Sequence, residues 1–123
     1  IPKVSFELEQ CMRSFGFSDE QVLDIQLAVE EAITNSIVHG YAGGTGTLGI
    51  RCRAGPEEVT VEISDNAPPF DPLDVPDPDI SADIREREIG GLGVFLIKKV
   101  TDRATYRYEN AQNILTLVKK KNR

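Results

Sequence analysis

Apolar residues recur at steps of three and four over residues 1–40, which is the spacing of one helix face. One such face runs through residues 4–15 and predicts a first helix that Gly16 ends. A longer helix is predicted from about Asp19 to His39, with Gly40 placed to cap it. Its apolar face comprises Val22, Ile25, Val29, Ala32, Ile33 and Ile37, beside a second stripe of Leu23, Leu27 and Val38.

Several signals agree on where the second helix begins. Ser18 is a suitable N-cap, and Gln21 three residues later completes a capping box. Phe17 and Val22 have the spacing of a hydrophobic staple across the same boundary. Together these residues place the helix start at Asp19.

Three polar residues, Glu31, Asn35 and His39, follow one another at i, i+4 steps along this helix. The Cβ atoms of Glu31 and Asn35 are expected about 5–6 Å apart, at the border of the apolar face. An amide oxygen is a suitable ligand for Mg²⁺, so Asn35 could hold a metal while Glu31 orients or deprotonates a nucleophile. The alternative, a partly exposed polar helix edge, is the more common meaning of this spacing taken alone.

Alternating apolar and polar residues predict two strands after a glycine-rich loop. Residues 47–54 and 59–65 each place apolar side chains on one face and are expected to pair as a hairpin. Asp65 ends the apolar row of the second strand. It either initiates a turn with Asn66 or accepts a hydrogen bond from a ligand amine, and the residues support both interpretations equally.

Residues 66–79 carry five of the seven prolines, which excludes a helix or a sheet interior there. Residues 81–88 are compatible with a short charged helix. Long connections of this kind are often functional lids or disordered segments. We therefore expect a mobile flap.

Residues 90–93, with the sequence GGLG, begin a helix that is expected over residues 92–101. Exposed N–H groups at a helix start form an anion site, although a hinge or a tightly packed helix end would have the same sequence. The run lacks the Lys and Ser or Thr of a P-loop, and it does not directly follow a strand as a dinucleotide fingerprint does. Residues 104–109 and 114–119 predict two further strands joined by a hairpin turn.

Composition limits the class of protein. With 123 residues, 40% hydrophobic and 28% charged, the chain is expected to be one soluble globular domain over residues 1–123, in the cytoplasm. A net charge of -6 argues against nucleic-acid and anionic-membrane binding. Cys11 and Cys52 match no metal spacing and are expected to be free thiols. Because the chain begins with Ile1 and not Met, it is compatible with a domain of a longer protein.

The order of these features resembles the N box, G1 box, ATP lid and G2 box of the GHKL (Bergerat-fold) ATP-binding superfamily, over nearly the whole chain. The segments EEAITNSIVHGY, DNAPPFDP and GGLGVFLIKKV look like those of the anti-sigma-factor serine/threonine protein kinases and their stand-alone regulatory relatives. The resemblance implies an α+β fold. This would be a two-layer α/β sandwich with a mixed, mainly antiparallel sheet and three helices on one face.

The resemblance also implies roles for single residues. Glu31 corresponds to the catalytic base, Asn35 to the Mg²⁺ ligand, and Asp65 to the acceptor from the exocyclic amine of adenine. Thr116 aligns with a hydroxyl near the adenine, although a threonine in a strand needs no such role. His39 occupies the family's HG position with no role beyond a helix-end cap. The turn that faces the phosphates corresponds to Gly91, Leu92 and Gly93.

The G1 box departs from the family pattern D-x-G-x-G, because Ala67 and Pro69 replace its glycines. Stand-alone members of the family tolerate proline at the second position. The Cβ of Ala67 is expected to crowd the backbone near the base or to forbid a positive φ, and so to weaken adenine binding.

The resemblance implies ATP- and Mg²⁺-dependent phosphoryl transfer to a serine or threonine of a protein partner, an anti-sigma antagonist, with a sigma factor as a further partner. One alternative is a non-catalytic nucleotide-binding module that sequesters such a partner. A histidine-kinase catalytic domain is a second alternative, but it needs a phosphoacceptor histidine, and the single histidine is His39. No nucleic-acid or membrane partner is expected, and a homodimer is left open.

Overall fold

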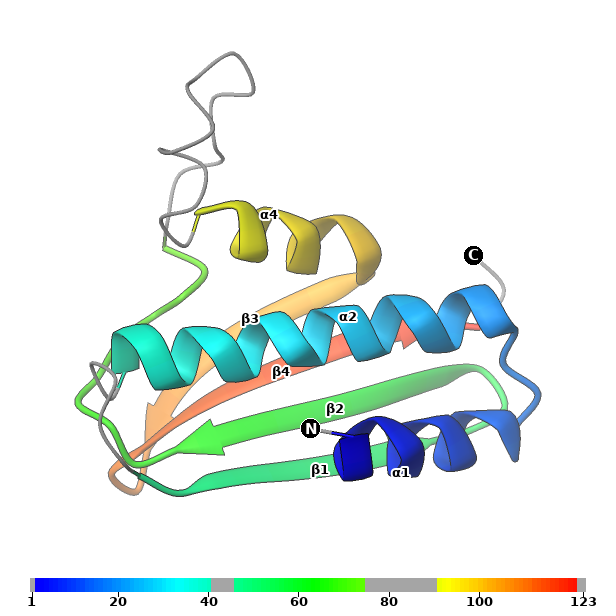
Figure 1. The fold of residues 1–123 in the computed structure, drawn as a ribbon, viewed down its shortest axis with the longest axis horizontal. Coiled ribbons are helices and arrows are strands. Elements are labelled where there is room, and N and C mark those ends of the chain that lie inside the picture. The colour runs from blue at the N-terminus through cyan, green and yellow to red at the C-terminus, as the bar shows by residue number, and fades with distance from the viewer. Residues whose placement is uncertain (1, 41–45, 75–90, 122–123) are drawn as a thin grey trace, which may run out of the picture.

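The computed structural model describes residues 2–40, 46–74 and 91–121, which form a layer of helices over a sheet (Figure 1). The helices are α1 (Pro2–Arg13), α2 (Asp19–Asn35) and α4 (Gly91–Val100), and a π-helical turn, η1 (Ser36–Gly40), continues α2. The strands are β1 (Leu48–Ala54), β2 (Glu58–Asp65), β3 (Arg103–Glu109) and β4 (Gln112–Lys120). The short helix predicted at residues 81–88 lies outside the described residues.

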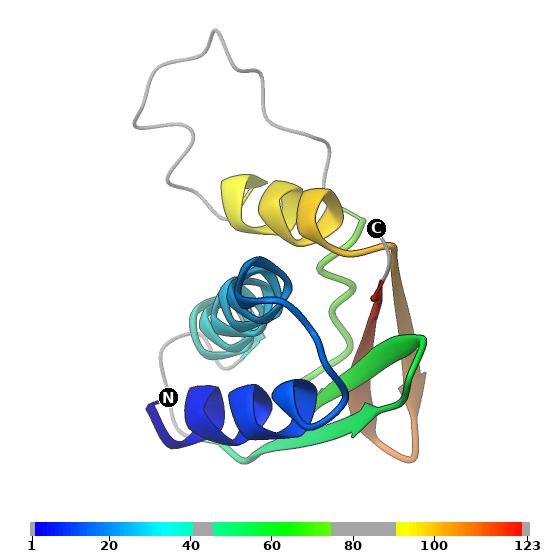
Figure 2. The same cartoon turned by 90° about the vertical axis from the view of Figure 1, so that its right-hand side faces the viewer.

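The strands form one sheet in the order β1-β2-β4-β3, and all three pairings between the described strands are antiparallel. The described sheet is thus wholly antiparallel and not mixed as expected. β4 lies between β2 and β3 because the chain leaves β2, forms α4 and β3, and returns through a tight turn. The three α-helices cover one face of the sheet, which confirms the expected α+β sandwich (Figure 2).

The start of α2 is built as its sequence predicts. The Ser18 hydroxyl accepts a hydrogen bond from the Gln21 amide (3.2 Å), and the Gln21 side chain accepts one from the Ser18 amide (3.0 Å). The Gln21 side-chain amide also donates to the carbonyls of Lys120 and Lys121, at the end of the inner strand β4. The capping box therefore fixes both the start of the helix and its position over the sheet.

The core lies between α2 and the two central strands. On α2 the predicted face is buried at Val22, Ile25, Val29, Ala32 and Ile33, against Val59, Val61 and Ile63 of β2 and Leu115 and Leu117 of β4. The second apolar stripe of α2 is not part of this core. Leu23 is 62% exposed and Val38 51% exposed, because α1 and α4 flank the helix and leave its outer side uncovered.

The helix remains helical to Gly40, close to its predicted end, but its last five residues form η1 with a π-type hydrogen-bond pattern. A π-turn rotates successive side chains less than an α-turn does, so the 3.6-residue period fails here. Ile37, predicted on the buried face, is accordingly exposed. The change of pattern begins directly after Asn35, and π-turns often occur at functional sites.

The turn between β3 and β4 is a two-residue hairpin turn. Glu109 pairs with Gln112, and both residues between them have a positive φ, 53° at Asn110 and 60° at Ala111. Asparagine adopts this left-handed conformation readily, whereas alanine does so at a cost of about 1–2 kcal/mol. The turn therefore stores strain at Ala111.

We predict that Ala111→Gly raises the free energy of unfolding by roughly 0.5–1 kcal/mol, because glycine relieves the left-handed strain and offsets its greater freedom in the unfolded chain. Urea denaturation would measure the change. Ala104→Gly in β3 is the matched control and should destabilise, since Ala104 lies in regular strand structure. A lower stability of Ala111→Gly would show that the turn is not strained.

Candidate functional site

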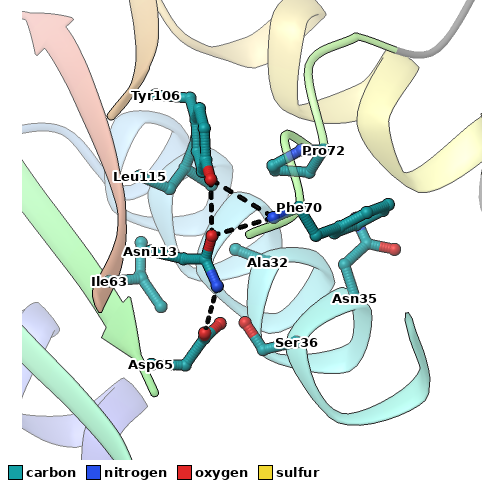
Figure 3. Close-up of a pocket in the computed structure, with 10 residues that line it drawn as sticks. All are labelled: Ala32, Asn35, Ser36, Ile63, Asp65, Phe70, Pro72, Tyr106, Asn113 and Leu115. Atoms are coloured by element: carbon teal, nitrogen blue, oxygen red, sulfur yellow. Dashed lines mark hydrogen bonds between the residues drawn. The ribbon is translucent and has the colours of Figure 1, made fainter. Parts of the chain in front are cut away.

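A pocket lies where the end of α2, the ends of β2 and β4, and the segment after β2 meet (Figure 3). The pocket is narrow, because the volume open to a water-sized sphere is about 20 Å³. Apolar side chains form most of the wall, and polar groups are placed at a few points. The apolar residues are Ala32, Ile63, Phe70, Pro72 and Leu115, and the polar residues are Asn35, Ser36, Asp65, Tyr106 and Asn113.

Asp65 enters the pocket from the end of β2. It continues the buried row of Val59, Val61 and Ile63, and it is 7% exposed. Its Oδ1 accepts hydrogen bonds from the Ala67 amide (3.1 Å) and from Asn113 Nδ2 (2.8 Å). No hydrogen bond from the described residues reaches Oδ2. The side chain thus caps a local turn with one oxygen and leaves the other for a ligand, so the two interpretations of Asp65 are compatible.

Asn35 faces the same pocket from the last turn of α2. It is 7% exposed, and its Nδ2 atom is buried without a hydrogen-bond partner in the part of the chain that the structure describes. A buried amide group without a partner costs about 1–3 kcal/mol. An orphaned group of this kind beside a pocket is expected where a ligand completes the hydrogen bonding.

Glu31 and the start of α4 are not part of the described lining of this pocket. Glu31 is half-buried one turn before Asn35 on α2, and it is not among the residues that line the pocket. Residues 91–93 form the first turn of α4, which packs against α2. In Figure 1, α4 runs antiparallel to α2, and its start lies over the C-terminal half of that helix.

The structure differs from the expectations for Thr116 and Ala67. Thr116 faces away from the pocket, because it pairs with Glu62 and Thr105 on the open face of the sheet, whereas the inner face of β4 carries Asn113 and Leu115. The structure thus does not bring Thr116 to the position that the resemblance implies. Ala67 is buried but does not have a positive φ, so the conformation of this segment is one that alanine adopts without strain.

The sequence matches the family of histidine kinase-like ATPase domains over residues 1–119. The chain belongs to this family. It is 32% identical over 105 residues to the serine-protein kinase RsbW of Listeria monocytogenes, an alignment that covers 81% of this chain and 67% of the relative. RsbW of Halalkalibacterium halodurans is 29% identical (85% of this chain, 65% of the relative), and the anti-sigma F factor of Clostridium acetobutylicum is 26% identical (83% and 71%).

Tyr106, Phe70 and Asn113 line this pocket, and the sequence analysis missed them. Asn113 was assigned to a hairpin turn, whereas β4 begins at Gln112 and places Asn113 opposite Asp65. The alternation of Asn113, Leu115 and Leu117 is a signal that could have found it. Tyr106 lies on β3, and burial raises the pKa of its phenol.

The described residues contain neither a candidate membrane span nor a metal-binding cluster of His, Cys, Asp and Glu. None of the helices there has the length and apolar character of a membrane span. No cluster of three or more His, Cys, Asp or Glu side chains suited to a metal occurs in the same ranges. Cys11 and Cys52 are free thiols with Sγ atoms 3.2 Å apart, and burial raises the pKa of Cys52 to about 12.

We predict that Asp65→Ala lowers the free energy of unfolding by about 1–3 kcal/mol, because the Ala67 amide and the Asn113 side chain lose a buried acceptor. Asp65→Asn retains an acceptor oxygen at the same place and should cost less. Urea denaturation of the ligand-free protein compares the two variants. Equal losses would mean that the hydrogen bonds to Oδ1 do not matter for stability.

Proposed function

We propose that this ATPase domain binds ATP with Mg²⁺ and transfers the γ-phosphoryl group to a serine or threonine hydroxyl of a partner protein. The observation that carries the proposal is that two polar side chains meet in one pocket of a chain that belongs to the family. Asp65 accepts no hydrogen bond at Oδ2 from the described residues, and the amide nitrogen of Asn35 is buried without a partner among them. Their positions suit the two ends of a nucleotide, a base and a metal-bound phosphate chain.

The base would lie in the apolar part of the pocket. Ala32 and Leu115 offer surfaces for a flat ring, from the helix and the sheet respectively. An ionised Asp65 can only accept hydrogen bonds, so its free oxygen matches a base that presents an amino group. Adenine has such a group.

The metal and the phosphates would lie toward Asn35 and the start of α4. The amide oxygen of Asn35, and not its unpaired nitrogen, would be the Mg²⁺ ligand, because this ion takes oxygen ligands and keeps several positions for water and phosphate. The nitrogen would remain a donor for a phosphate oxygen. Bound Mg²⁺ would neutralise charge on the phosphates. The first turn of α4, at residues 91–93, would add backbone N–H groups at the positive end of the helix dipole.

Glu31 is the proposed general base. Phosphoryl transfer requires mainly positioning and charge neutralisation, so one carboxylate near the acceptor hydroxyl is a sufficient protein base. Glu31 lies one turn from Asn35, on the same edge of α2, and outside the apolar part of the pocket. A base there would be beside the phosphate end of the nucleotide and not beside its base.

The proposed partners are an anti-sigma antagonist as phosphoryl acceptor and a sigma factor as a bound protein. The names of the relatives, serine-protein kinase RsbW and anti-sigma F factor, support this class of partner. A non-catalytic module that binds nucleotide and sequesters such a partner is the second candidate. It is favoured by Ala67 and Pro69, which replace the glycines of the family's G1 pattern.

We predict that Glu31→Gln lowers the rate of phosphate transfer to the partner by about 10²–10⁴-fold, the usual contribution of a general base, with ATP binding retained. The assay mixes the domain, Mg·ATP and a candidate antagonist, and detects phosphate on the antagonist. Glu30→Gln, the neighbouring carboxylate on the same helix, is the matched control and should leave the rate unchanged. Transfer that survives Glu31→Gln would remove Glu31 from the mechanism. A wild-type domain that is stabilised by ATP but transfers nothing would support the second candidate.

We predict that Asn35→Ala removes the Mg²⁺-dependent part of the stabilisation by ATP. Thermal melting with millimolar ATP, with and without Mg²⁺, measures this part, because stabilisation follows RT ln(1 + [L]/Kd). The ligand-free variant should melt within a few degrees of wild type, since the Asn35 amide nitrogen has no partner to lose within the described chain. The same Mg²⁺-dependent shift in wild type and variant would contradict Asn35 as the metal ligand.

A further inference from the structure

Asn113 is a buried polar residue at the centre of the pocket wall, and none of the roles above uses it. It is 6% exposed and lies on the inner face of β4, directly opposite Asp65 of β2. Its Nδ2 atom donates to Asp65 Oδ1 (2.8 Å) and also lies 3.1 Å from each of the carbonyl oxygens of Ala67 and Pro68. One amide nitrogen thus ties the strand-end carboxylate to the segment that follows it.

The other end of the same amide holds the next part of this segment. Asn113 Oδ1 accepts hydrogen bonds from the Phe70 backbone amide (3.0 Å) and from the Tyr106 hydroxyl of β3 (2.5 Å). Figure 3 shows these bonds converging on Asn113 from the strand and from the segment after β2. The amide orientation is fixed, because three acceptors surround the nitrogen and two donors surround the oxygen.

This arrangement determines how Asp65 meets a ligand. Asn113 and the Ala67 amide both donate to Oδ1, so the carboxylate plane is held and Oδ2 is left as the single acceptor for the pocket. A carboxylate without these bonds could rotate and present either oxygen, and binding would then require it to be ordered. Asn113 keeps the Asp65 carboxylate ordered before a ligand binds.

Asn113 also holds the backbone of residues 67–70, which lack the glycines of the family pattern. Residues 67–70 contain alanine and prolines where the family pattern has glycines, and their backbone is held by one amide from the neighbouring strand. We propose that Asn113 is the positioning residue of the base subsite, which orients Asp65 and holds residues 67–70 at the wall of that subsite. This inference rests on the proposed nucleotide binding and adds a residue to it.

Asn113→Asp tests the proposal with a change of one atom. The new oxygen takes the place of the donor Asn113 Nδ2 and faces Asp65 Oδ1. The two carboxylates then repel each other, and Asp65 Oδ2 no longer has the position in which it accepts from a ligand. At low pH the two carboxyls share a proton, and the protonated form again donates a hydrogen bond to Asp65. The other titratable groups nearby are Tyr106, bonded to Asn113, Tyr108, paired with Asn113 between β3 and β4, and Asp71, whose charge acts on Tyr106.

The measurement is the Kd of ADP by calorimetry, at pH 8.0 and at pH 5.5, for wild type and Asn113→Asp. We expect the variant to bind at least about tenfold more weakly than wild type at pH 8.0, the value of a hydrogen bond to a charged group. The ratio of the variant's Kd to the wild-type Kd should be at least about threefold lower at pH 5.5 than at pH 8.0. Taking the ratio at each pH removes the titration of ADP itself.

Two further variants complete the test. Gln112→Glu adds the same charge one residue along β4, where alternation places it on the open face, and its Kd should stay within twofold of wild type. If Asn113→Asp does not fold, Asn113→Ala replaces it, with an affinity loss of similar size that pH does not restore. A wild-type domain that binds no ADP would overturn both the nucleotide site and this role. Wild-type binding with a ratio near one at both pH values, or an affinity loss in Asn113→Asp that is the same at both, would overturn only the role of Asn113.

Discussion

The site depends on a buried pair of polar residues at the end of the inner face of the sheet. Asp65 and Asn113 are directly opposed in the β2–β4 register, at the point where two apolar rows end. A buried carboxylate and a buried amide are tolerated only when their hydrogen bonds are made. Asp65 and Asn113 form hydrogen bonds with each other and with the segment after β2. The hydrogen bonds that make their burial possible therefore also shape one wall of the pocket.

Helix α2 joins this wall to the core. The first part of the helix is anchored by its capping box and buries an apolar face on the sheet, which leaves little freedom to slide. Asn35 is its last α-helical residue, and the change to π-type bonding at Ser36 follows at once. The Asn35 side chain, which lines the pocket, is therefore held by a packed helix on one side, while the chain beyond it leaves the regular geometry.

Helices, strands and their boundaries have local sequence signals and were predicted. The strand register, which decides the face on which a residue lies, has no such signal and was missed. Ser18, Gln21 and the alternating strands have local signatures, so the element order and the boundaries agree with the structure to within about two residues. Asp65 and Asn35 were identified because an ordered set of motifs resembles a family. Asn113 was missed and Thr116 misplaced for one reason: which face of β4 a residue occupies depends on the start of the strand, and a shift of one residue exchanges the faces.

The opposite end of the same inner row shows why unsatisfied groups at the pocket are informative. There Lys119 is opposed to Val59 and is nearly as buried as Asp65, yet its ammonium donates to the Val100 carbonyl (2.8 Å) and lies 3.3 Å from the Asp24 carboxylate. A charge at that end is matched by partners from α4 and α2, and its role is to join helices to sheet. At the pocket end, one oxygen of Asp65 and the amide nitrogen of Asn35 have no such partner among the described residues. Thr116 Oγ1, on the open face of the sheet, is also buried without a partner in the described part of the chain, so the unpaired nitrogen of Asn35 is informative because it lies in the same pocket as Asp65.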